Sequence, residues 1–169
     1  MNILEQTRPG RDTFVADFAG SALFERTFQE GMALVEQTAS YLDGDGRRES
    51  KRLGRSTALA YAGESMRLTT RLMQIASWLL VQRAVREGDM APGEACDSRY
   101  RVGAQAVCQT VETADDDLPP PLLDLLKRSE ALYERVLHLD RRMYADDEDL
   151  GPVNPVLSQV ERLRAAFGA

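Results

Sequence analysis

Few residues in this chain have the types and spacing that catalysis requires. His138 is the only histidine, and helical periodicity places it opposite the apolar residues of its segment, where a solvated imidazole lacks the positioned partner that a general base needs. No EXXH or HEXXH pair occurs, so the sequence predicts no helical metal site. Cys96 and Cys108 do not have the spacing of zinc ligands, and we expect both to be reduced thiols.

Two other segments have compositions that can bind ligands, but both favour a structural role. Residues 43–46 are rich in glycine yet lack the GxxxxGK[ST] and GxGxxG patterns of phosphate-binding loops, so we interpret them as a helix-ending turn. The three aspartates at 115–117 precede three prolines, and such runs are usually solvated turns or helix caps. The sequence therefore predicts no catalytic residue, no cofactor and no metal, and we do not expect an enzyme.

The composition is that of a single soluble domain. With 169 residues, 43% of them hydrophobic, the chain is long enough to bury a core. The formal net charge is −6, and the acidic excess after residue 88 disfavours nucleic-acid binding, which depends on neutralising phosphates. No apolar run reaches about 18 residues and the N-terminus lacks a signal-peptide pattern, so we expect a cytoplasmic protein with no membrane span.

Apolar periodicity predicts an all-α fold, a three-helix bundle with a long central helix, over residues 21–150. The expected helices cover residues 21–43, from about 47 to 87, and 122–144. Gly54 marks a kink or break in the second of these, and Gly88 ends it. The remaining segments are expected to be an N-terminal lead-in at 1–20, either mobile or partly docked, an irregular connection at 88–120, and a short amphipathic tail at 151–169, disordered or helical.

Two of the expected helices have one apolar face each. On the first helix, Gly31 shares the face and lets another helix approach closely. The expected face residues are Phe24, Phe28, Met32, Val35, Ala39 and Leu42 on the first helix, and Leu122, Leu125, Leu126, Leu132, Tyr133, Val136, Leu139 and Met143 on the third.

The central helix differs because it has two apolar stripes, more than a quarter turn apart. A helix with two apolar stripes needs cover from two sides, supplied either by its own chain alone or by a second subunit. We favour a homodimer, with Leu59, Met66, Met73 and Leu80 as the candidate interface. The first stripe is Tyr61, Leu68, Leu72, Ile75 and Leu79, and the second is Leu59, Ala62, Met66, Met73, Leu80 and Ala84.

Asp140 falls within the apolar arc of the third helix, where a buried carboxylate needs a partner. Arg67 and Arg71 on the polar strip of the central helix are the candidate partners in a structural ion pair. A peripheral Asp140 bonded to water is the alternative.

Two exposed segments are candidates for binding a partner protein. Arg47, Arg48, Lys51 and Arg52 form a basic cluster, which is either a solvated helix start or a docking patch for an acidic surface. In the tail, Leu157, Val160 and Leu163 belong to an apolar stripe that either docks on the bundle or binds a partner as a helix in a groove.

Three stretches of the chain resemble the bacterial RcdA family, the regulators of CtrA degradation. They are ALVEQTASYLDGDGRRESKRLG, ESMRLTTRLMQIASWLLVQRAVREGDM and LLKRSEALYERVLHLDRRM, which match in order from about residue 24 to 143. The resemblance implies a non-enzymatic adaptor that delivers CtrA-type cargo to the ClpX/ClpP protease (ClpXP). It also implies a CpdR-like priming factor and a PopA-like effector as partners, and a cytoplasmic location with recruitment to a cell pole.

Two other functions remain open on the residues alone. A pocket lined by Arg67 and Arg71 would indicate a small-anion binder, whereas self-association without further partners would indicate a purely structural homodimer.

Overall fold

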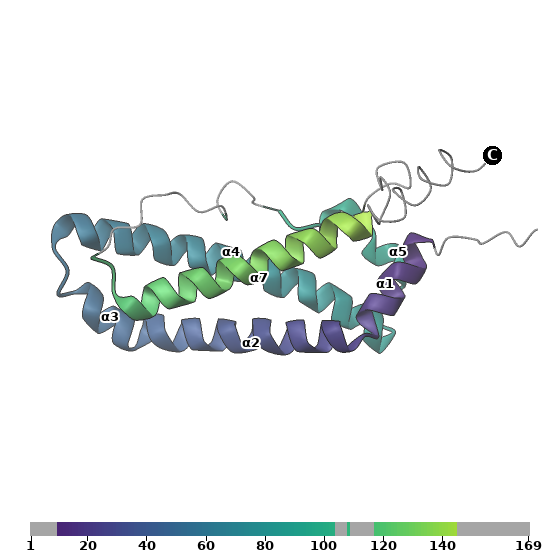
Figure 1. Ribbon diagram of the computed structural model, residues 1–169, viewed down its shortest axis with the longest axis horizontal. Coiled ribbons are helices and arrows are strands. Elements are labelled where there is room, and N and C mark those ends of the chain that lie inside the picture. The colour runs from purple at the N-terminus through teal and green to yellow at the C-terminus, as the bar shows by residue number, and fades with distance from the viewer. Residues whose placement is uncertain (1–9, 104–107, 109–116, 145–169) are drawn as a thin grey trace, which may run out of the picture.

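The computed structural model describes residues 10–103, 108 and 117–144, and every regular element in these ranges is helical (Figure 1). The sequence therefore predicted the all-α class correctly. The elements are α1 (Arg11–Ala19), α2 (Ala22–Asp43), α3 (Asp45–Ser50), α4 (Arg55–Glu87), α5 (Pro92–Ala95), the 3₁₀ turn η1 (Ser98–Tyr100) and α7 (Pro120–Tyr144).

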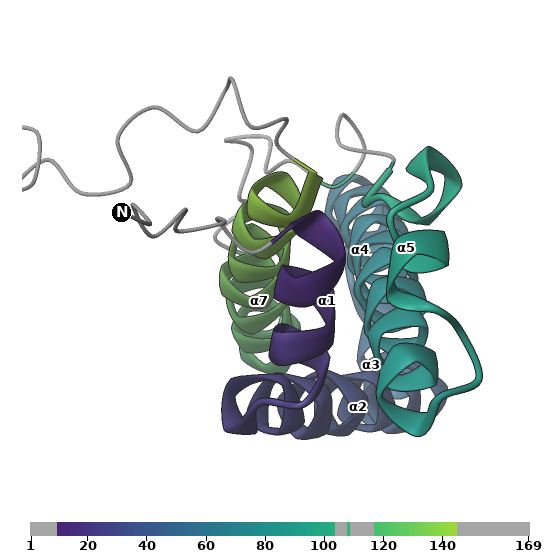
Figure 2. The same cartoon turned by 90° about the vertical axis from the view of Figure 1, so that its right-hand side faces the viewer.

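Helices α2, α4 and α7 form the bundle. Helix α4 runs antiparallel to α2, since the end of α2 and the start of α4 lie at the same end of the molecule (Figure 1). It runs parallel to α7, because α7 begins at that same end. Seen along the bundle, the three long helices stand at the corners of a triangle, with α1 across one end and α5 beside α4 (Figure 2).

The helix ends follow local signals in the sequence. Ser21 caps α2, and its side-chain oxygen accepts a hydrogen bond from the backbone N–H of Phe24 at 3.1 Å. Gly88 ends α4 with a φ of 80°, a left-handed conformation that glycine adopts without strain. The helix expected from about residue 47 is divided in two, since α3 ends at Ser50 and Gly54 caps the start of α4.

The core lies between the three long helices. All five residues of the first stripe of α4 are buried, from Tyr61 to Leu79, together with Trp78. On α7 the expected face is correct, because Leu122, Leu132 and Val136 are fully buried, whereas Leu126 and Leu139 are partly buried at its margin.

Helix α2 is rotated slightly from the expected orientation. Leu34 is 1% exposed, whereas Ala39, which was expected on the buried face, is exposed. Two threonines, Thr27 and Thr38, join the buried face, and the Thr27 hydroxyl donates to the Leu23 carbonyl at 2.8 Å. The bond within its own helix lets Thr27 enter the core, which apolar periodicity does not predict.

Part of the expected N-terminal lead-in is a helix instead. Val15, Phe18 and Ala19 of α1 are buried against the end of the bundle. The Phe18 ring lies 5.8 Å from that of Phe24 and 5.7 Å from that of Trp78. Three apolar residues at helical spacing are enough here because the end of the bundle offers an aromatic surface to cover them. Residues 1–9 lie outside the described residues.

Candidate interaction surfaces

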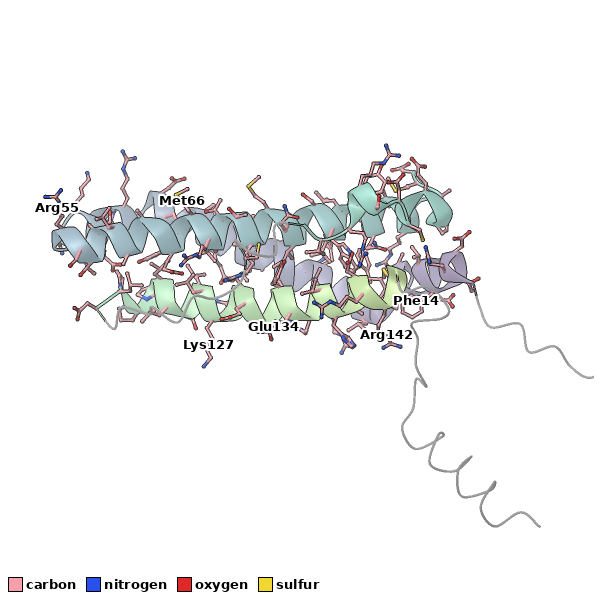
Figure 3. The ribbon with its side chains drawn as sticks, turned by 90° about the horizontal axis from the view of Figure 1, so that it is seen from above. Phe14, Arg55, Met66, Lys127, Glu134 and Arg142 are labelled. Carbon is pink, nitrogen blue, oxygen red and sulfur yellow. The ribbon has the colours of Figure 1, made fainter. Side chains whose placement is uncertain are left out.

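The four candidate interface residues of α4 lie on its outer side. Their exposed fractions are large for apolar side chains, and Met66 points away from α7 in Figure 3. We name this set the outer stripe: Leu59 (69% exposed), Met66 (72%), Met73 (63%) and Leu80 (51%). Within the described part of the chain, α4 is thus covered on one apolar side, and its second apolar side remains open to solvent.

A shallow apolar groove runs beside the outer stripe, between α4 and α2. Its volume is about 280 Å³. Met73 belongs both to the groove and to the outer stripe, so the two form one continuous apolar surface. The other lining residues are Val35, Thr38, Ala39, Leu42 and Asp43 on α2, and Thr69, Leu72 and Ala76 on α4.

The basic cluster lies at the end of the bundle where α3 leads into α4. Arg47 and Arg48 are on α3, and Lys51 and Arg52 follow in the turn; all four are exposed. Arg48 forms an ion pair with Asp45 one turn earlier. The structure brings these four residues together at one end, separate from the middle of the outer stripe. The tail candidates Leu157, Val160 and Leu163 lie outside the described residues.

The expected ion pair between Asp140 and an arginine of α4 is not formed. Asp140 is buried, but its Oδ1 accepts from Trp78 Nε1 at 3.1 Å and from the Val102 backbone N–H at 3.3 Å. Its Oδ2 lies 3.4 Å from the guanidinium nitrogens of Arg101. Helices α4 and α7 run parallel, so residues later on α4 lie beside residues later on α7. Trp78 therefore lies beside Asp140, whereas Arg71 lies beside Ser129, about 16 Å earlier along α7. A buried Asp140 was thus predicted correctly, and its partners were not.

The two candidate arginines have different environments. Arg67 is partly exposed and pairs with Glu64 on its own helix. Arg71 is 2% exposed, and its Nε and Nη2 donate to the Cys108 carbonyl at 3.0 and 2.8 Å. Its Nη1 donates to the Ser129 hydroxyl at 2.8 Å. Every nitrogen of the Arg71 guanidinium thus donates to a protein oxygen.

Three further contacts were not predicted from the sequence. Two of them join Gly103, in the segment after η1, to the bundle, and one joins α4 to α7. Gln74 Oε1 accepts from the Gly103 N–H at 3.0 Å, and the Tyr133 hydroxyl donates to the Gly103 carbonyl at 3.5 Å. The third is the Trp78 bond to Asp140. Of these contacts, only the one made by Trp78 could have been anticipated from the sequence, because a tryptophan next to a buried helical stripe needs an acceptor for its N–H.

Burial determines the electrostatics of these groups. Desolvation raises the pKa of Asp140 above its ordinary 3.8, although the Val102 N–H and the Arg101 charge oppose the rise. Burial also raises the pKa of both thiols, Cys96 and Cys108, and both are free cysteines as expected. Raised thiol pKa values disfavour the reactive thiolate form, so neither cysteine resembles a nucleophile.

Among the described residues, no group of three or more His, Cys, Asp or Glu side chains is placed to hold a metal ion. His138 is exposed, as expected. None of the described helices is both long and apolar enough to cross a membrane.

The fold and its surfaces define a helical scaffold whose most distinctive features are an exposed apolar stripe and a basic end. Residues 15–167 match a family model described as "Protein of unknown function (DUF1465)". Among solved structures, the chain is similar to the crystal structure of RcdA from Caulobacter crescentus CB15, with 62% sequence identity and a TM-score of 0.63. The match covers 78% of this chain and 99% of that one.

No curated protein matches the chain. The chain belongs to the RcdA family, a family of regulatory proteins.

Proposed function

We propose that this protein is a non-enzymatic adaptor that delivers CtrA-type cell-cycle regulators to the ClpXP protease. It acts together with a CpdR-like priming factor and, for some cargo, a PopA-like effector. The proposal rests on membership of the RcdA family, whose likeness to this chain extends over 99% of the Caulobacter protein. An adaptor needs two binding surfaces on one scaffold, because tethering raises the local concentration of cargo at the protease.

The outer stripe is the observation that supports a scaffold for protein contacts most directly. Four large apolar side chains, each at least 51% exposed, repeat every seven residues along α4. Apolar side chains scattered singly on a surface need no explanation, but a continuous row beside an apolar groove is typical of a protein-binding surface. We assign this surface to a homodimer, and the basic cluster just before the start of α4 to an acidic protein partner.

A proteolysis assay tests the adaptor function. Purified ClpX, ClpP, priming factor and a CtrA-type cargo are incubated with and without this protein, and loss of cargo is followed over time. We expect degradation to accelerate only when this protein is present. Charge reversal of the basic cluster (Arg47→Glu with Lys51→Glu) should slow delivery, whereas the control Arg141→Glu, on an exposed position of α7, should not. Cargo loss that is independent of this protein would contradict the proposal.

Light scattering tests the homodimer separately. Met73→Asp should give a folded monomer, because a charge cannot be buried at an apolar interface without a partner. An unchanged dimer would exclude this surface as the interface. A purely structural homodimer is the rival function, and it predicts self-association with no effect on cargo degradation.

A further inference from the structure

The residues between the members of the outer stripe are small. Going along α4, each interval between two large side chains contains a pair of short ones on the same side of the helix. These pairs are Ala62 and Gly63, Thr69 and Thr70, and Ala76 and Ser77. Helix surfaces that alternate large and small residues pack best when the large side chains of one helix enter the gaps of the other.

We propose that two copies of this chain pair through α4 in antiparallel orientation, with Met66 of the second copy lying against Ala76 and Ser77. This inference rests on the proposed homodimer and specifies its geometry. In this register Met73 lies against Thr69 and Thr70 of the second copy, and Leu80 against Ala62 and Gly63. Every large side chain of the outer stripe except Leu59 then enters a gap between small residues.

A parallel dimer would fit this surface poorly. Two-fold symmetry requires a parallel pair to align each residue with its own copy. Met66 would then meet Met66 and Met73 would meet Met73, while the small pairs between them would face each other across voids. Unfilled space in an interface lowers its stability, because the atoms that line the space lose van der Waals contacts. The alternation of sizes therefore favours the antiparallel arrangement.

Charge at the two ends of α4 favours the same arrangement. Arg55 is exposed at the first residue of the helix, and Glu87 is exposed at its last. The antiparallel register places Arg55 of each copy opposite Glu87 of the other. A parallel pair would place Arg55 opposite Arg55, where like charges repel. Sliding the antiparallel pair by one heptad would move Arg55 away from Glu87.

The groove beside Met73 accommodates this partner. Ala76, which contacts Met66 of the second copy in this register, is one of the residues that line the groove between α4 and α2. The volume of about 280 Å³ leaves room for a methionine side chain to bend toward α2. The second copy would therefore cover both the outer stripe and part of the groove.

Distance measurement by pulsed electron resonance tests the register. A nitroxide is attached at Ser56→Cys, on a flank of α4, in a chain that carries Cys96→Ser and Cys108→Ala and is first shown by scattering and circular dichroism to keep its size and helix content. At 1.5 Å per residue, we expect about 45 Å between the two labels in the proposed register. The slipped register gives about 35 Å, and a parallel pair gives less than roughly 20 Å.

Charge reversal provides a second test with a matched control. Arg55→Glu and Glu87→Arg should each weaken the dimer about 2- to 30-fold, and the double variant should recover most of the loss. Arg141→Glu, on α7, should leave the dimer unchanged. A label distance near 35 Å or below 20 Å, no recovery in the double variant, or a monomer in the label experiment would overturn the inference. Acceleration of cargo degradation is measured independently, so a failure of the register is distinguishable from a failure of the adaptor function.

Discussion

The indole Nε1 of Trp78 donates a hydrogen bond to Oδ1 of Asp140 at 3.1 Å, and this buried contact ties α4 to α7 near one end of the bundle. The same carboxylate oxygen accepts from the backbone N–H of Val102, in the segment that follows η1. One aspartate therefore connects three parts of the chain that are far apart in sequence. Trp78 is also the only tryptophan, so its fluorescence reports directly on this contact.

Replacing Asp140 by alanine should destabilise the fold strongly. The substitution leaves the Trp78 and Val102 donors buried without an acceptor, and each unsatisfied group costs about 1–3 kcal/mol. Asp140→Asn should cost less, because the amide oxygen can accept in place of Oδ1. Urea unfolding followed by Trp78 fluorescence measures both. The control is Asp124→Ala, an exposed position on α7 paired with Arg128, for which we expect a change within about 0.5 kcal/mol. Equal losses for the alanine variants at 140 and 124 would contradict this account.

The raised pKa of Asp140 predicts a specific pH dependence. Because the folded state holds its proton more tightly than the unfolded state, the contribution of Asp140 to stability is greatest below the ordinary pKa of 3.8. This contribution falls as pH rises from 3.8 through the raised pKa of the folded state, and it is constant above that. The measurement is the difference in unfolding free energy between the wild type and Asp140→Asn across pH 3.5 to 7. A difference that grows in favour of the wild type with rising pH would show the opposite sign.

Arg71 and Arg67 form a matched pair for a test of burial, since they lie one turn apart on α4. Arg71→Lys should destabilise the fold by about 1–3 kcal/mol, because a single ammonium cannot bond both the Cys108 carbonyl and the Ser129 hydroxyl as the forked guanidinium does. Arg67→Lys keeps a partly exposed pair with Glu64 and should change stability by less than about 0.5 kcal/mol. Thermal and urea unfolding of the two variants give the comparison, and similar losses at both positions would refute the difference in roles.

The sequence predicted what depends on periodicity and local signals. The first stripe of α4, the cap at Ser21 and the end of α4 at Gly88 follow from residue spacing or from backbone preference. Both are properties of a single helix. Likewise, periodicity separated Met66 and Met73 from the buried stripe, and the structure leaves both exposed. Which partner covers them is not a property of one chain, so the dimer remains a prediction.

The contacts that sequence reasoning missed all depend on how helices lie relative to one another. Arg67 and Arg71 share a strip on the helical wheel, and only the position of α7 decides that Arg71 is the buried one. The sequence could not indicate the bond between Val102 and Asp140, because the donor is a backbone N–H in an irregular segment. Helix α1 was missed because its few apolar residues become informative only once an aromatic surface is in place beside them.

Gly46 offers a test of close packing where α2, α3 and α4 meet. A Cβ at this position would lie 2.6 Å from the Tyr61 hydroxyl oxygen and 2.9 Å from the Tyr41 carbonyl oxygen. Gly46→Ala should therefore destabilise the fold by about 1–3 kcal/mol despite the better helix propensity of alanine. The control is Gly63→Ala on α4, where nothing in the chain itself lies within 4 Å of the added Cβ. There the propensity gain should stabilise the helix by up to about 1 kcal/mol. Both variants are made in the Met73→Asp monomer, because the proposed second copy packs against Gly63. Unfolding midpoints measured at one protein concentration compare the two variants, and a Gly46→Ala protein as stable as its Met73→Asp parent would show that the contact with Tyr61 is loose.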